Sequence, residues 1–191
     1  MLNSDVGRAG RVASSWKQAL WIGLLLAGSI GFSFVFACAT PFAALAALAA
    51  LNMPQRDVYS VVGGAWVANQ AIGYGFLHYP QTWDSFAWGG AIGIACAVGA
   101  VASVIVAPRI ARWGKVTSVA AAFLAAFAAY QAGLFVASLG LPGGGFSLSV
   151  LSQVLVTNVG ALIGLVVAHQ IAVAVGLVAR AVPSAQRPVV A

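Results

Sequence analysis

The chain has 191 residues, of which 62% are hydrophobic and only 6% are charged, and its mean hydropathy is +0.98. A soluble domain carries about 25% charged residues, so this composition excludes a soluble protein and indicates an integral membrane protein. The apolar runs rarely alternate with polar residues, which disfavours a transmembrane β-barrel.

The first apolar run follows a polar segment at residues 1–15 and extends from 16 to 51 without a charge after Lys17. It is too long for a signal peptide and about twice the roughly 20 residues that one transmembrane helix needs. Pro41 divides the run, and proline disfavours helix at the residue before it. We therefore predict a hairpin with helices over 16–36 and 40–52. A single long broken helix is the alternative.

Four more apolar runs follow, separated by polar, basic or glycine-rich segments. We predict helices over 58–77, 86–107, 117–139 and 148–179. The connecting segments are 52–57, 78–85, 108–115 and 140–147. The sequence thus predicts an all-α fold, a bundle of six transmembrane helices. This single domain covers 16–180 and lies between the segment 1–15 and a tail at 181–191.

The basic residues predict the orientation of the bundle. With six helices, all nine Lys and Arg residues fall on one side, which the positive-inside rule makes cytoplasmic. The only charged residue expected on the opposite side is Asp84. Both termini are then cytoplasmic, and we expect a multi-pass protein of a bacterial inner membrane. No basic cluster remains for nucleic acid, so the lipid bilayer is the expected surrounding partner.

Amide and aromatic side chains interrupt the apolar pattern in the outer half of the predicted bundle. Amides in hydrocarbon normally face the bundle interior, where they either join helices or line a cavity. Their number here favours a cavity for a small molecule, since such sites combine apolar walls with a few polar groups. The candidate substrate-binding residues are Asn69, Gln70, Tyr74, Tyr79, Trp83, Trp88, Gln131 and Asn158.

Two residues at predicted outer helix ends, Cys38 and His78, are candidate metal ligands. Thiolate and neutral imidazole both bind transition metals. Each residue also has a simpler interpretation, as a buried thiol and as an interfacial histidine.

Small residues recur at every fourth position of the first predicted helix, at Ala19, Gly23, Ala27 and Gly31. Such a stripe lets another helix approach closely. The approaching helix belongs either to the same chain or to a partner subunit, and the sequence leaves both interpretations open.

Several activities lack their sequence signatures. There is no Walker A motif, no carboxylate inside the predicted membrane segments and no nucleophile–base pair. We therefore expect neither an enzyme nor a chain that hydrolyses ATP, and no cofactor of its own.

The predicted bundle, its length and the stripe on the first helix resemble the S-components of energy-coupling-factor (ECF) vitamin transporters. The stretch "WVANQAIGYGFLHYP" (66–80) looks most like the solitary vitamin B12 S-components of proteobacteria. The resemblance covers most of 16–180 in topology, and the stripe is similar to the AxxxA docking motif of that family.

The resemblance implies that the chain takes up a vitamin, a cobalamin or related corrinoid, from the outer face. It further implies a separate ECF-type transmembrane and ATPase module as partner. A cysteine near the outer side binds the corrinoid cobalt in the B12 group, and Cys38 and His78 are the candidates here. The alternatives are a small cobalt or nickel permease and a structural assembly factor of a membrane complex.

Overall fold

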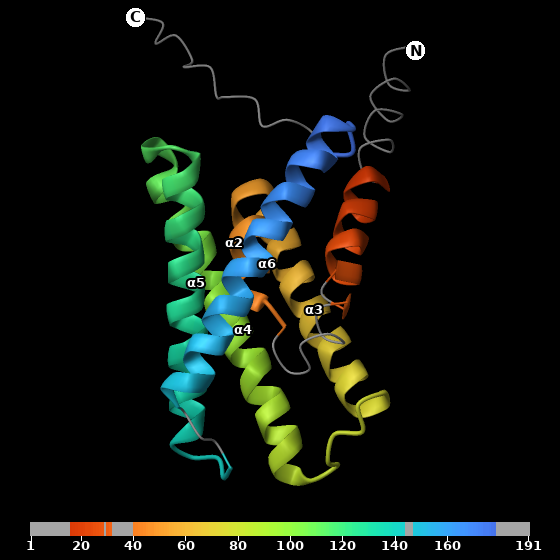
Figure 1. Ribbon diagram of the computed structural model, residues 1–191, viewed down its shortest axis with the longest axis vertical. Coiled ribbons are helices and arrows are strands. Elements are labelled where there is room, and N and C mark those ends of the chain that lie inside the picture. Colours follow the sequence, from red (N-terminus) through yellow and green to blue (C-terminus); the bar gives the residue numbers. More distant parts are fainter. Residues whose placement is uncertain (1–15, 29, 32–39, 144–146, 179–191) are drawn as a thin grey trace, which may run out of the picture.

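The computed structural model describes residues 16–28, 30–31, 40–143 and 147–178, and its regular elements in these ranges are all helical, which confirms the all-α fold (Figure 1). An N-terminal helix covers 16–28 and is helical again at 30–31. The elements that follow are α2 (Phe42–Asn52), α3 (Gln55–Gly75), α4 (Trp83–Ile110), the short 3-10 helix η1 (Ala111–Trp113), α5 (Lys115–Ser138) and α6 (Leu148–Ala174).

Three of the described helices are long and apolar enough to cross a membrane: α4 together with η1, α5 and α6. Most of their surface is not covered by other parts of the chain, and in α6 only 11% of the most apolar stretch is buried. Apolar surface of this extent is stable in lipid and unstable in water. The helices therefore indicate a membrane protein.

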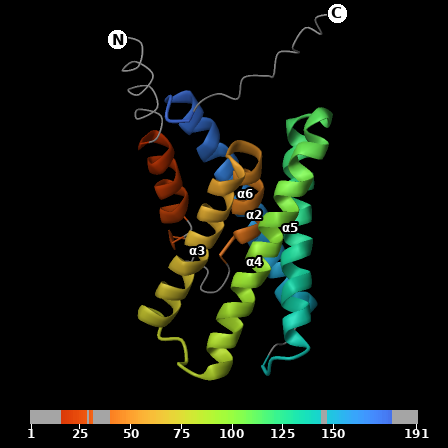
Figure 2. The same cartoon turned by 180° about the vertical axis from the view of Figure 1, so that it is seen from behind.

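α2 is too short to cross the membrane as these three helices can. Its 11 residues span about 16 Å, roughly half of the hydrocarbon core of a bilayer. Its residues from Phe42 to Ala49 are all buried. Figures 1 and 2 show why, since α2 lies inside the bundle among α3, α4, α5 and α6, with all of which it is in contact. The prediction of six membrane-spanning helices is therefore not confirmed.

Proline and small residues explain where α2 sits and how the long helices pack. Pro41 directly precedes α2, and its fixed φ suits a helix start. α4 and α5 approach closely because Gly99 faces the backbone of Ala126, where an added Cβ would lie 3.0 Å from the carbonyl oxygen. Ser103 donates a hydrogen bond to the carbonyl of Ala122 one turn further along.

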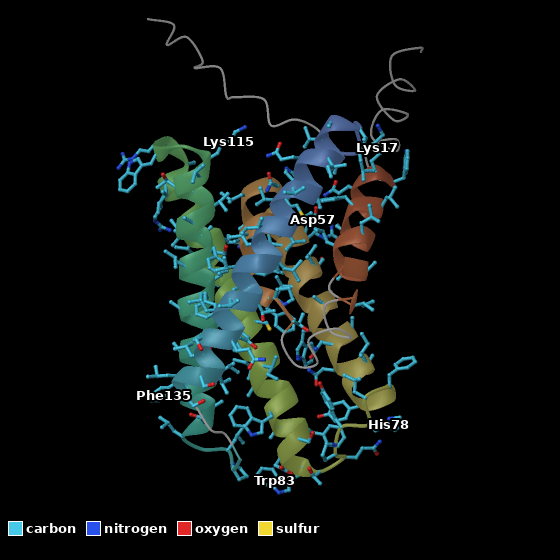
Figure 3. The ribbon with its side chains drawn as sticks, in the orientation of Figure 1. Lys17, Asp57, His78, Trp83, Lys115 and Phe135 are labelled. Carbon is cyan, nitrogen blue, oxygen red and sulfur yellow. The ribbon has the colours of Figure 1, made fainter. Side chains whose placement is uncertain are left out.

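The charged residues that Figure 3 labels gather at one end of the bundle. Lys17, Asp57 and Lys115 lie at this end, and His78 and Trp83 lie at the other. We refer to these as the basic end and the outer end. The separation agrees with the predicted charge distribution, and the cytoplasmic location of the basic end stays a prediction.

Several predicted helix boundaries are wrong by a few residues. α3 begins at Gln55 rather than at 58, because Pro54 supplies the helix start, and it ends at Gly75. α4 already begins at Trp83 and continues through Pro108 to Ile110. The predicted loops 78–85 and 108–115 are therefore partly helical, and α6 ends at Ala174 rather than at 179.

Candidate functional site

The start of α2 lies near the middle of the bundle (Figure 1), and the side chains of Asn69 and Asn158 form hydrogen bonds there. Thr40 precedes the helix and is buried, with 3% of its surface exposed. Nδ2 of Asn69, on α3, donates a 2.8 Å hydrogen bond to Oγ1 of Thr40. Asn69 is itself buried, so this bond ties α3 to the segment that leads into α2.

Asn158 on α6 contacts the same helix start. It exposes 1% of its surface, and its Oδ1 accepts a 3.4 Å hydrogen bond from the backbone N–H of Ala44. The first N–H groups of a helix have no partner within the helix, and lipid supplies none. Asn158 provides this partner weakly, because the bond is longer than the usual distance of about 2.9 Å.

Gln131 on α5 is buried at the level of the α2 start. The residue before it, Tyr130, has its ring centroid 6.0 Å from that of Phe42, the first residue of α2. Gln131 exposes 9% of its surface, and its Nε2 has no hydrogen-bond partner among the described residues. We call Thr40, Asn69, Gln131 and Asn158 the polar cluster.

The polar cluster combines groups from three helices and the segment before α2. All four residues are uncharged at neutral pH, and the hydroxyl of Thr40 accepts a hydrogen bond from Asn69. The cluster is therefore suited to hydrogen bonding with a small molecule.

Gln70 lies beside the cluster and between α3 and α4. Its Nε2 donates to Oδ1 of Asn69 at 3.3 Å, and its side chain lies against Gly89 of α4. The indole Nε1 of Trp66 also donates to the carbonyl of Gly89, at 2.9 Å. These contacts join α3 to α4.

The outer aromatic candidates Tyr74 and Tyr79 are packed at the α3–α4 contact. The ring of Tyr74 stacks on that of Phe86 with centroids 4.8 Å apart, and its hydroxyl lies 3.2 Å from Oγ of Ser85. Tyr79 meets Tyr74 edge to face, with centroids 6.0 Å apart. These rings are engaged with each other, so they form one wall of the outer half of the bundle.

The two tryptophan candidates stand apart from this wall. Trp83 lies at the outer end and exposes 68% of its surface (Figure 3). Nε1 of Trp88 donates a 2.9 Å hydrogen bond to the carbonyl of Pro142, which ties α4 to the segment between α5 and α6. The structure thus brings together the amides of the predicted site and separates Trp83 from them.

The structure describes one of the two predicted metal ligands. Cys38 lies outside the described residues, and His78 is exposed just after α3 with a φ of 54°. Among the residues that the structure describes, no three His, Cys, Asp or Glu side chains form a group able to hold a metal ion.

The small-residue stripe of the N-terminal helix faces away from the bundle. Ala19, Gly23, Ala27 and Gly31 are all exposed. Trp21 and Leu25, on the other side of the helix, are buried. Within the described part of the chain, the stripe therefore does not serve the packing of this helix against the rest of the bundle.

Two features of the interior were not predicted. Thr40 was overlooked as a partner of Asn69, although a threonine before a proline in an apolar run marks a helix start. His169 of α6 packs against Trp21, with ring centroids 5.7 Å apart, and its Nδ1 has no hydrogen-bond partner in the part of the chain that the structure describes. This ring pair joins the N-terminal helix to α6 near the basic end.

Comparison with known proteins finds no matching family model, no similar curated protein and no similar solved structure.

Proposed function

We propose that this chain is a membrane-embedded binding subunit that takes up a vitamin, a cobalamin or related corrinoid, from the outer face. The observation that carries the proposal is the polar cluster, because it gathers buried amides from α3, α5 and α6 in an otherwise apolar bundle. Amides placed on apolar walls are typical of small-molecule sites.

The position of the cluster supports entry from the outer end. Asn158 is buried, but none of residues 148–157, which lie between it and the outer end of α6, is buried. α2 fills the bundle only on the side of the basic end (Figures 1 and 3). α2 thus occupies the side of the cluster toward the basic end, which is compatible with entry of a ligand from the outer end.

The N-terminal helix supports a role with a partner subunit. Its exposed stripe of small residues is flanked by the exposed side chains of Leu20 and Leu24, and helices in lipid associate through such small-residue stripes. The chain has no Walker A motif, so energy from ATP has to come from other chains. We propose an ECF-type transmembrane and ATPase module as that partner, with the whole assembly in a bacterial inner membrane.

The test is the visible spectrum of the protein purified in mild detergent, followed by titration with cyanocobalamin. We expect corrinoid absorbance that co-purifies with the protein, or saturable binding of added cyanocobalamin. A colourless protein that binds no corrinoid would contradict the corrinoid assignment. Binding of cobalt or nickel ions in its place would favour a metal permease, and no binding at all would favour an assembly factor.

A further inference from the structure

We infer that the polar cluster binds a hydrogen-bond acceptor, the oxygen of a carboxylate or carboxamide group, through the amide of Gln131 and the N-terminus of α2. The inference rests on the proposed function, since the acceptor is a group of the substrate. In this interpretation, Thr40, Asn69 and Asn158 hold the helices together, and the side chain of Gln131 contacts the ligand.

The starting point is the unpaired amide of Gln131. A buried donor without an acceptor destabilises a protein, and such groups are rare in native structures. Among the described residues, Nε2 of Gln131 is such an unpaired donor. Gln131 exposes only 9% of its surface, so it is 91% buried. A leucine at this position would avoid the cost, so the amide points to a ligand.

The direction of Gln131 follows from its place on α5. Gly133 packs on α4, where an added Cβ would lie 3.0 Å from Cβ of Ala95. Residues two apart in a helix differ in direction by about 200°, so Gln131 projects from the side turned away from α4. The other helix in extensive contact with α5 is the short helix α2. Because Gln131 is buried and follows Tyr130, whose ring lies 6.0 Å from that of Phe42 at the start of α2, we infer that its amide is turned toward this helix start.

The remaining amides of the cluster already have partners. Nδ2 of Asn69 donates to Thr40, and its Oδ1 accepts from Gln70. Nδ2 of Asn158 donates to the carbonyl of Val154 at 3.0 Å, and its Oδ1 accepts from Ala44. Among the described amides of the cluster, Nε2 of Gln131 is thus the nitrogen that has no partner at all, and a donor requires an acceptor in the ligand.

The start of α2 adds to this preference. The N-terminus of a helix carries a partial positive charge and unpaired N–H groups, and both favour an oxygen acceptor. The N–H of Ala44 is held by Asn158 only at 3.4 Å, which leaves it incompletely satisfied. Interrupted helices in membrane transporters present their N-termini to anionic substrate groups in the same way.

The test compares Gln131→Leu with Gln131→Met, which has a similar length, and with the control Gln153→Leu on the exposed side of α6. Each purified protein is titrated with cyanocobalamin, whose ring carries carboxamide arms, and with cobyrinic acid, whose arms are carboxylates. The ligand-free melting temperature is recorded in parallel.

We expect both Gln131 variants to melt at a higher temperature than the wild type and to bind the better probe about tenfold more weakly, because one buried hydrogen bond is lost. The control should keep the wild-type affinity. Preference for cobyrinic acid identifies a carboxylate, and preference for cyanocobalamin a carboxamide. Unchanged affinity in both Gln131 variants overturns the inference alone. A wild-type protein that binds neither probe overturns the corrinoid assignment and this inference together.

Discussion

The backbone conformation of His78 allows its imidazole to be removed without straining the chain. Its φ of 54° lies in the left-handed region, which costs a non-glycine residue about 1 kcal/mol or more. Glycine adopts this conformation without that cost. The residue therefore ends α3 in a conformation that glycine would also support, and substitution by glycine removes the imidazole without disturbing the helix end.

We predict that His78→Gly leaves the melting temperature unchanged or slightly raised, whereas His78→Ala lowers it. Comparing the two variants separates the loss of the imidazole from a change in stability, so His78→Gly is the variant for the spectral test of axial coordination. One of the substitutions His78→Gly and Cys38→Ala should shift the absorbance of bound corrinoid and weaken binding, and the other should do little. A double variant with unchanged spectrum and affinity would exclude axial coordination by either residue.

The sequence allowed us to predict which residues of the interior are polar, but not what they contact. Asn69, Gln131 and Asn158 are all buried, as amides in an apolar run are expected to be. Their separate roles depend on where α2 begins, because Thr40 and Ala44 are the partners of two of them. Those contacts join residues 29 and 114 positions apart, and no local pattern encodes them.

At the scale of helices, glycine positions decide how closely α4 and α5 approach. An added Cβ at Gly99 would meet the backbone oxygen of Ala126 at 3.0 Å, whereas Gly90 on the same helix faces open space. We predict that Gly99→Val lowers stability by about 1–3 kcal/mol, as overpacking does, because the backbone of α5 must move. Gly90→Val is the matched control and should be tolerated. Thermal unfolding in detergent measures both, and equal effects would refute close packing at Gly99.

The exposed small-residue stripe of the N-terminal helix allows a test of docking to a partner subunit. An added Cβ at Gly23 would have no heavy atom within 4 Å, so Gly23→Leu adds bulk on the open side of the helix. We predict that it abolishes uptake in cells, since a partner helix can no longer approach, and leaves substrate binding by the purified chain intact. Leu25→Ala on the buried side is the contrasting variant and should lower stability instead. Normal uptake by Gly23→Leu would argue against docking at this stripe.

The length of each helix was easier to predict than its role in the bundle. Pro41 correctly divides the first apolar run, because proline is compatible with a helix start and not with its interior. The hydropathy of α2 nonetheless resembles that of a spanning helix, because a short helix enclosed by other helices is as apolar as one in lipid. Only its 11-residue length distinguishes the two.

For the whole molecule, the firmest prediction concerns the two ends. In a variant without native cysteines, a membrane-impermeant thiol reagent added from outside should label cysteine at position 81 or 139. It should not label position 56 or 112, which lie in the segments adjoining Asp57 and Lys115 at the basic end (Figure 3). Labelling of 56 from outside would contradict the predicted orientation.

The bond between Asn158 and the start of α2 also has a consequence for how the protein is made. The ribosome completes α2 long before it reaches α6, since 114 positions separate Ala44 from Asn158. Until then the N–H groups at the α2 start lack this partner, and lipid offers no substitute. We therefore expect α2 to reach its final depth only after α6 has been inserted. A chain truncated before Leu148 should then leave α2 at the membrane surface, exposed to membrane quality-control proteases.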